Sequence, residues 1–172
     1  MSTLTKQLLV LTSLDHQSYQ PTFKRVSVKE QIEQTIRQNE WRFEEYQLHV
    51  RVEIPTLITQ GDPDMLMQVW ENIVTNAVKY NQPNGIIHIN GFEWENELHI
   101  TLQDSGIGMT VAQAEKAFDR FYRADFSRTR EKEGTGLGLA IVSEVVKQHG
   151  GLVEIESKVG KGTIIHITLP KL

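Results

Sequence analysis

Two glycine-dense stretches limit how this chain can fold: residues 104–109 read DSGIGM, and residues 134–139 read GTGLGL. Glycine adopts positive φ angles and lets a ligand approach the backbone closely, but it costs about 0.5–1 kcal/mol inside a helix or strand. Such clusters therefore favour turns over regular elements. A carboxylate, Asp104, leads the first of them. Two glycine turns in one small chain predict a binding site.

No glycine-containing stretch of the chain completes a common nucleotide-binding motif. The stretch VGKGT at 159–163 resembles the end of a Walker loop, but Ile155 and Gly162 stand where that motif needs a glycine and a serine or threonine. The stretch 134–139 has two glycines of a dinucleotide fingerprint, but Leu139 replaces the third, and no strand leads into the turn. A P-loop and a Rossmann site are both excluded.

A chain of 172 residues, with 39% hydrophobic and 23% charged residues, fits one globular domain or one domain plus an appendage. A formal net charge of −4 argues against a general nucleic-acid binder, which normally has a basic face. No apolar run approaches the roughly 20 residues of a membrane span, and no signal peptide opens the chain. The absence of cysteine excludes disulfides and thiolate zinc sites and fits a cytoplasmic domain.

The chain divides into a short helical segment and a main domain. Leucines recur at helical spacing in residues 4–15, which are too few to fold alone and therefore resemble the end of a longer helix. Pro21 interrupts this pattern, and Ser27 then opens a new helix with a capping box. We place the helical segment and a linker at 1–21 and the main domain at 22–172.

Strands and helices mix in the main domain without regular βαβ alternation. Asp62 is a helix N-cap followed by proline, Glu95-Asn96 predicts a hairpin, and Thr110 opens a second capping box. We expect helices from 27, over 63–80, from 110 and from the second glycine turn to 150, and strands at 47–54, 85–94, 97–103, 151–157 and 162–170. The fold class is α+β, with an antiparallel or mixed sheet and helices on one face.

The predicted helix 63–80 carries a polar row, in which Asn72, Asn76 and Lys79 stand at i, i+4 and i+7. The row borders an apolar stripe of Leu66, Val69, Ile73, Ala77 and Tyr80. An amide oxygen suits Mg²⁺, which is usually shared with substrate phosphates, and the lysine could reach those phosphates. From spacing alone, a solvated helix edge explains the row as well.

Five stretches follow one another in a recognisable order: the Asn/Lys/Tyr helix, DSGIGM, AFDRFYRAD, GTGLGLAIV and GKGT. Together they resemble the ATP-binding catalytic domain of sensor histidine kinases, a branch of the superfamily that also holds gyrase B, Hsp90 and MutL. The similarity covers roughly residues 22 to 170. It implies a two-layer α/β sandwich of the Bergerat type, with a mixed, mostly antiparallel sheet and helices on one face.

The resemblance implies roles for the helix 63–80. Its stretch ENIVTNAVKYN makes Asn76 the expected Mg²⁺ ligand, Lys79 a phosphate contact and Tyr80 a packing partner of adenine. Asn72, also expected in the nucleotide site, stands where ATP-hydrolysing relatives have a glutamate that activates water. Because an amide cannot accept that proton, we expect the chain to hold ATP for transfer rather than to hydrolyse it.

The resemblance also explains both glycine turns. In the family, the carboxylate matching Asp104 accepts a hydrogen bond from the adenine amine, and the turn of Gly106, Ile107 and Gly108 lets the base approach. The second turn brings backbone N–H groups to the triphosphate at a helix N-terminus, where the macrodipole favours negative charge. Its expected contacts are Gly134, Thr135, Gly136, Leu137, Gly138 and Leu139. Thr163, in the last box, should hydrogen-bond Asp104 directly or through water.

The stretch AFDRFYRAD carries aromatic and basic residues. Phe118 and Phe121 are expected in the core, since this box anchors the base of a mobile lid in the family. The charged stretch at 125–135 is the expected lid. Arg123 matches a position that approaches the phosphates, and it completes the expected catalytic set of Asn76, Lys79 and Arg123.

A histidine kinase also needs a phosphate-accepting histidine on a helical dimerisation hairpin. His16 precedes a proline by five residues, as in the family's acceptor box, but Gln17 replaces the acid, and the stretch from His16 to Asn72 is too short for the rest of the hairpin. We therefore expect residues 1–21 to end the hairpin's second helix and the acceptor to lie outside this chain. The expected partners are that hairpin domain and a response regulator, in a homodimeric parent that is commonly membrane-bound, while the chain itself should be monomeric.

Two functions of different class remain open: the catalytic module of a histidine kinase, and a degenerate nucleotide-binding module that regulates a partner without transfer activity. The other histidines suggest no further chemistry. His149 ends a predicted helix, where a cation suits the dipole. Solvated strand faces are expected for His49, His88, His99 and His166.

Overall fold

A computed structural model describes residues 2–15, 20–124 and 134–172. The elements are α1 (Thr3–Asp15), β1 (Lys24–Ser27), α2 (Val28–Glu45), β2 (His49–Glu53), β3 (Ile58–Gly61), α3 (Pro63–Lys79), β4 (Ile86–Trp94), β5 (Glu97–Asp104), α4 (Val111–Glu115), α5 (Gly138–Gln148), β6 (Leu152–Lys158) and β7 (Gly162–Pro170).

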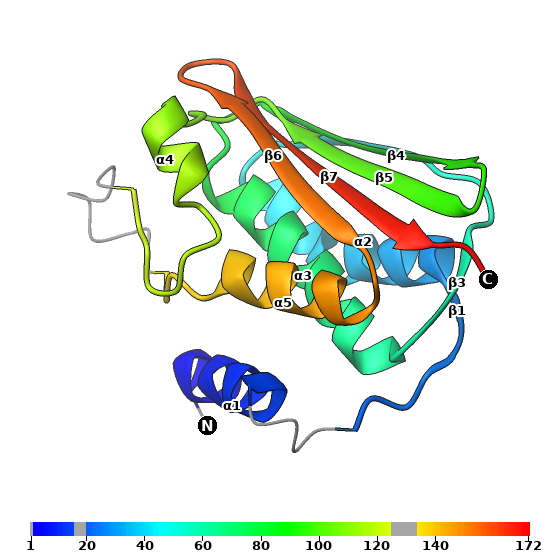
Figure 1. Ribbon diagram of the computed structural model, residues 1–172. Coiled ribbons are helices and arrows are strands. Elements are labelled where there is room, and N and C mark those ends of the chain that lie inside the picture. The colour runs from blue at the N-terminus through cyan, green and yellow to red at the C-terminus, as the bar shows by residue number, and fades with distance from the viewer. Residues whose placement is uncertain (1, 16–19, 125–133) are drawn as a thin grey trace.

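One sheet and one layer of helices make up the main domain. The sheet has the order β2-β4-β5-β7-β6, in which only the β2–β4 pair is parallel. Helices α2, α3 and α5 cover one face of it (Figure 1). The predicted α+β fold, a two-layer sandwich with a mostly antiparallel sheet, is confirmed.

The core lies between these two layers because both kinds of element are amphipathic. Alternate residues of the central strands point inward, as the two-residue period requires, and are at most 5% exposed: Ile87, Ile89, Leu98, Ile100, Leu102, Ile165, Ile167 and Leu169. The predicted stripe of α3 faces them, with Leu66 and Val69 fully buried. Tyr80 is an exception, since it caps the C-terminus of α3 and lies half-buried beyond the core.

Local signals placed the helix starts. The Asp62 carboxylate accepts hydrogen bonds from the N–H groups of Asp64 and Met65, with Pro63 at the first helical position. The Thr110 capping box is present, but its helix α4 ends at Glu115 and is shorter than the predicted segment suggests.

A second, two-stranded sheet of β1 and β3 was not predicted. Its strands are four residues long and pair Val26 with Thr59, both almost completely buried. The stretches KRVS and ITQG are too short to show a clear alternation of apolar residues. This small sheet closes the end of the domain where α2 and α3 begin.

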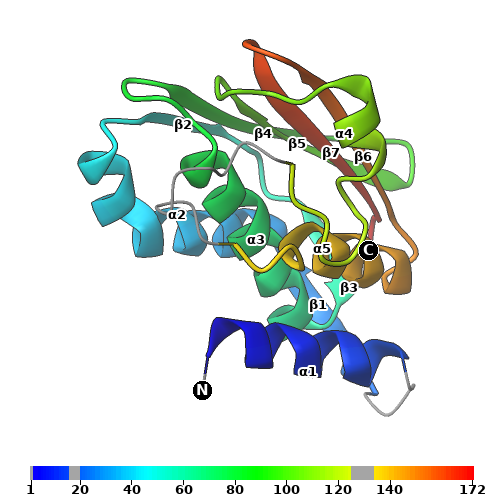
Figure 2. The same ribbon diagram turned by 90° about the vertical axis from the view of Figure 1, so that its left-hand side faces the viewer.

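Helix α1 packs on the helical layer, on the side away from the sheet (Figures 1 and 2). Leu11 and Leu14 are 2% and 4% exposed and belong to the hydrophobic core. Leu4 and Leu8, which share the predicted stripe with Leu11, are 41% and 39% exposed. The second half of α1 is therefore anchored to the domain, whereas its first half presents leucines to solvent. In the described ranges, no helix is both long and apolar enough to span a membrane.

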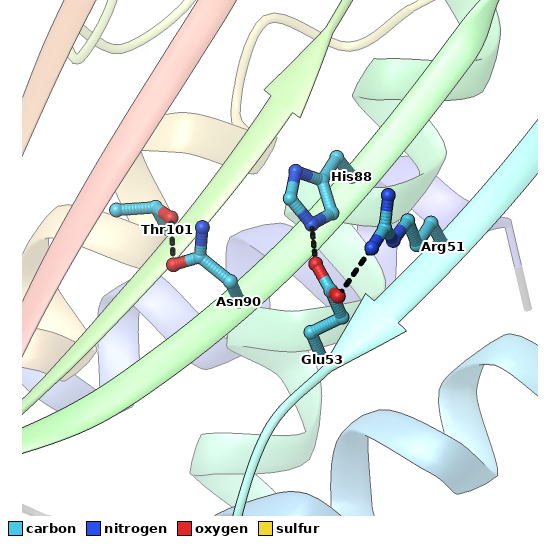
Figure 3. A network of polar contacts seen from close by, with 5 residues as sticks. All are labelled: Arg51, Glu53, His88, Asn90 and Thr101. Atoms are coloured by element: carbon cyan, nitrogen blue, oxygen red, sulfur yellow. Dashed lines mark hydrogen bonds and ion pairs between the residues drawn. The ribbon is translucent and has the colours of Figure 1, made fainter.

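The outer face of the sheet is polar. Figure 3 shows Glu53 between His88, at 2.7 Å, and Arg51, while Thr101 donates to Asn90 at 2.7 Å. The hydrogen bond from His88, more than that from Arg51, lowers the pKa of Glu53. His99 and His166 lie on the same face, half-buried, with carboxylates of Glu97 and Glu156 at 3.6 and 3.2 Å.

His149 contradicts the expectation of a cation at the end of α5. Its ring is 4% exposed, the Asp62 N–H donates to Nε2 at 3.0 Å, and Nδ1 donates to the Val145 carbonyl at 2.7 Å. Nε2 must therefore be unprotonated, and burial lowers the pKa of the ring. The neutral ring, stacked on Phe23, ties the end of α5 to the start of α3.

We expect this histidine to make the fold sensitive to acid. The unfolded chain takes up a proton near pH 6.5, whereas the buried ring resists it, so the free energy of unfolding should fall as the pH drops below that value. The replacement His149→Gln should cost about 1–3 kcal/mol at neutral pH and reduce this pH dependence. Urea unfolding as a function of pH measures both, with His88→Gln on the outer face as the control. An unchanged pH dependence in His149→Gln would contradict the neutral assignment.

Candidate functional site

A cavity of about 1180 Å³ opens between α3, the two glycine turns and the segment after α4. Its lining includes residues from each of the predicted boxes. The expected site residues that line it are Asn72, Asn76, Lys79, Tyr80, Asp104, Ile107, Gly108, Arg123, Gly134, Thr135, Gly136, Gly138, Leu139 and Thr163. Positions far apart in the sequence thus meet around one space.

Two expected contacts lie behind this lining. A Cβ on Gly106 would lie 2.2 Å from the Tyr80 carbonyl oxygen, so its place is against the backbone at the end of α3. Leu137 is fully buried and belongs to the core. Both residues shape the turns from behind, and neither presents a side chain to the cavity.

Asp104 is the buried carboxylate of the site. It is the last residue of β5, is 8% exposed, and accepts the Gly106 N–H on Oδ1 at 2.8 Å. Burial raises its pKa to about 6, and hydrogen bonds from the backbone of Gly106 and Thr163 partly oppose this rise. An acceptor held in this way can receive a donor from a ligand in the cavity.

Backbone packing around Asp104 explains the glycines of the first and last boxes. Gly108 has φ of +65°, and a Cβ there would lie 1.9 Å from the Lys158 carbonyl oxygen. Gly162 has φ of +96°, and its Cβ would lie 2.0 Å from the carbonyl oxygen of Asp104. The two turns therefore pack backbone against backbone, which larger residues would prevent.

A backbone hydrogen bond joins Thr163 to the Asp104 carboxylate, which agrees with the predicted contact between these two residues, while the Thr163 hydroxyl contacts Ser157 instead. That hydroxyl lies 2.8 Å from Ser157 Oγ, and Ser157 also accepts the Met109 N–H at 2.8 Å and donates to the Gly162 carbonyl at 3.0 Å. Ser157 thus joins the two turns beside the carboxylate. This role of Ser157 was not predicted, because a serine within an alternating strand carries no signal of it.

The polar row of α3 faces the second glycine turn. The Lys79 ammonium lies 5.1 Å from the Tyr80 ring centre and 2.1 Å from where a Cβ of Gly134 would stand. The Asn72 amide donates to the Gln68 carbonyl at 2.7 Å. Asn76 lines the cavity, and none of the described residues hydrogen-bonds its side chain. The amide oxygen of Asn76 is therefore available to a ligand or an ion.

Helix α5 begins in the second turn. Gly136 has φ of +71° and accepts the Phe121 N–H at 2.8 Å. The N-cap residue Leu137 has no capping side chain of its own, and its N–H donates to the Thr135 hydroxyl at 3.3 Å. Gly136 and Gly138 line the cavity, so the positive end of α5 borders it. Phe121 itself is 59% exposed and lines the cavity, so the expectation that it belongs to the core is wrong.

Arg123 adds a second cation beside Lys79. Burial raises the pKa of Tyr80, and the nearby charge of Arg123 opposes that rise.

The described ranges contain no group of three histidine, cysteine, aspartate or glutamate side chains that could hold a metal. A divalent ion here would need phosphate oxygens besides Asn76, which fits Mg²⁺. His16 and lid residues 125–133 lie outside the described residues.

Comparison with known proteins agrees with this geometry. Residues 61–172 match the family described as histidine kinase-, DNA gyrase B-, and HSP90-like ATPase. The sensor protein kinase WalK of Staphylococcus saprophyticus is 38% identical over 172 residues, which are 99% of this chain and 28% of WalK. The chain thus spans about 28% of the length of this relative.

Solved structures share the fold. The mycobacterial sensor histidine kinase MprB superposes with a TM-score of 0.77 at 26% identity, over 87% of this chain and 98% of that one. Histidine kinase ThkA, solved in complex with the response regulator protein TrrA, gives a TM-score of 0.76 at 21% identity over 98% and 48% of the two chains. With the matched boxes arranged around one cavity, the chain belongs to the family of histidine kinase-, DNA gyrase B- and HSP90-like ATPases.

Proposed function

We propose that this chain is the ATP-binding catalytic domain of a sensor histidine kinase and transfers the γ-phosphate of ATP to a histidine on a separate dimerisation hairpin. The observation that carries the proposal is the lining of the cavity, which combines the buried carboxylate of Asp104 with the cations Lys79 and Arg123 and the turn at the start of α5. A nucleotide has matching parts, a base with a donor amine and an anionic triphosphate.

Asp104 and Tyr80 would hold the adenine. The carboxylate accepts the exocyclic amine of the base, and burial strengthens that charge-assisted hydrogen bond. Tyr80 offers a half-buried ring at the C-terminus of α3 for packing against the base. Glycine at positions 106, 108 and 162 lets the surrounding backbone pack closely enough to form this part of the cavity.

Lys79, Arg123 and the N-terminus of α5 would hold the phosphates. Phosphoryl transfer requires mainly positioning and charge stabilisation from the protein, and these groups provide both. Asn76 would hold Mg²⁺ through its amide oxygen, and the bound ion would neutralise charge on the phosphates. The acceptor must then approach from outside the chain.

Asn72 supports transfer over hydrolysis. Its amide donates to the Gln68 carbonyl and has no basic group that could take a proton from water.

The exposed Leu4, Leu8 and Leu9 of α1 would pack against the rest of the dimerisation hairpin. A response regulator would then receive the phosphate from the histidine.

Phosphate transfer in trans tests the proposal. The chain, mixed with γ-labelled ATP, Mg²⁺ and a separately prepared, histidine-bearing dimerisation hairpin, should label the hairpin with acid-labile, alkali-stable phosphate, as phosphohistidine requires. Without the hairpin it should release little phosphate. ATP binding without any labelling would favour the degenerate regulatory module, and rapid phosphate release without the hairpin would favour a hydrolase.

A further inference from the structure

Helix α1 contacts both segments that border residues 125–133. Near its start, Gln7 meets Thr135 of the second glycine turn, and at its end Asp15 meets Arg120 of the segment after α4. Thr3, Leu4 and Gln7 also line the cavity. Figure 2 shows α1 running along the helical layer beneath α3 and α5. The mechanism proposed above uses none of these α1 contacts.

The contact of Gln7 reaches a backbone group of the glycine turn. The Thr135 hydroxyl donates its proton to Gln7 Oε1 at 2.5 Å. The lone pairs of the hydroxyl oxygen therefore point away from Gln7 and can accept another hydrogen bond. The Leu137 N–H donates to that same hydroxyl oxygen at 3.3 Å. This N–H stands immediately before the first residue of α5, where the amides of a helix N-terminus bind phosphate. Gln7 and Thr135 therefore occupy a donor that an anion in the cavity would use.

The contact of Asp15 fixes the other end of α1. Its carboxylate accepts two hydrogen bonds from the Arg120 guanidinium, at 2.6 and 2.7 Å. The following residue, Phe121, donates its N–H to the Gly136 carbonyl. Both ends of α1 thus act on the same turn, one through Thr135 and one through the segment that carries Phe121.

We propose that α1 is an autoinhibitory latch, in which Gln7 and Asp15 hold the second glycine turn with its Leu137 N–H turned to Thr135 instead of to the triphosphate. Release of α1 frees this donor and strengthens phosphate binding. The inference rests on the proposed function, since it takes the turn to be the triphosphate site. It concerns the phosphates alone, so adenosine binding is independent of the latch.

The affinities of latch variants for two ligands test the inference. Gln7→Ala removes the acceptor of Thr135, and Asp15→Ala frees the far end of α1 without altering the cavity lining. Each should bind MgATP about two- to tenfold more tightly, the worth of one hydrogen bond, with unchanged affinity for adenosine. Thr12→Ala, a change at an exposed position of the same helix that does not line the cavity, is the matched control and should bind both ligands like the parent chain.

Coupling is reciprocal, which gives a second measurement. MgATP should speed hydrogen exchange of the amides in residues 4–15, and adenosine should not. If Gln7→Ala and Asp15→Ala bind MgATP equally or more weakly than the parent, the latch is wrong while the proposed function stands. If the parent chain binds no MgATP, the proposed function and the latch fail together.

Discussion

Asp104→Asn is expected to stabilise the nucleotide-free chain and to weaken its binding of adenosine and ATP. The pKa of Asp104 is raised to about 6 by burial, above its ordinary value of 3.8. Below about pH 4 both the folded and the unfolded chain hold the proton, so the carboxyl group has no cost. Stability is then lost as the pH rises to about 6, and at neutral pH the buried charge costs up to about 3 kcal/mol.

The uncharged amide of the variant avoids that cost. We expect a gain of about 1–3 kcal/mol in the free energy of unfolding at pH 7, and no loss of stability from this group between pH 4 and 6. The adenine amine meanwhile loses its charged acceptor, which is worth about 1.5–3 kcal/mol, or about 10- to 100-fold in affinity. Denaturant unfolding and calorimetry with adenosine measure the two effects separately.

Asp62→Asn is the matched control, because Asp62 is the other buried aspartate among the described residues. Its carboxylate caps α3 and also accepts the Thr22 N–H at 3.0 Å, and it does not line the cavity. The control should lose stability and keep the parent's affinity for adenosine. Adenosine itself does not titrate near pH 6, so its affinity for the parent chain should fall as the pH drops through that value. Unchanged adenosine affinity in Asp104→Asn would remove Asp104 from the base site.

Most of the fold follows from patterns that depend on near neighbours in the chain. The period of the apolar residues predicts the five strands of the main sheet and the helices that cover it, and the Asp62 and Thr110 caps fix two helix starts. The boxes also predict which residues line the cavity, since their order alone identifies the family. Gly108 and Gly162 show why these positions are constrained, because a Cβ at either would collide with a backbone carbonyl.

The errors concern contacts between distant segments. Ser157 accepts the N–H of Met109, which follows the first glycine turn, and donates to the carbonyl of Gly162, which opens β7. No local pattern in the sequence shows that these two segments meet. His149 looks like a helix-end cation until the Asp62 N–H is brought to its ring from 87 positions away. Phe121 looks like core but has a φ of 61° and faces the cavity. A dipole or a hydrophobicity argument cannot anticipate such packing.

Asn76→Ala is expected to separate phosphate binding from base binding. If the amide oxygen holds the Mg²⁺ that neutralises the phosphates, the variant should lose about 10- to 100-fold in affinity for MgATP and most of its transfer to a supplied hairpin. Adenosine, which brings no phosphate, should bind as before. The melting temperature should change little, because none of the described residues hydrogen-bonds this side chain.

Removal of the metal makes the comparison decisive. In the presence of a chelator the parent chain and Asn76→Ala should bind ATP alike, because the interaction that distinguishes them is gone. Asn90→Ala, a change in the Thr101 pair on the outer face of the sheet, is the control for asparagine truncation and should keep the MgATP affinity of the parent. If instead adenosine and MgATP weaken together in Asn76→Ala and the melting temperature drops, Asn76 is a structural amide at the edge of the core. The positive charge of Lys79, Arg123 and the α5 N-terminus would then have to hold the phosphates without it.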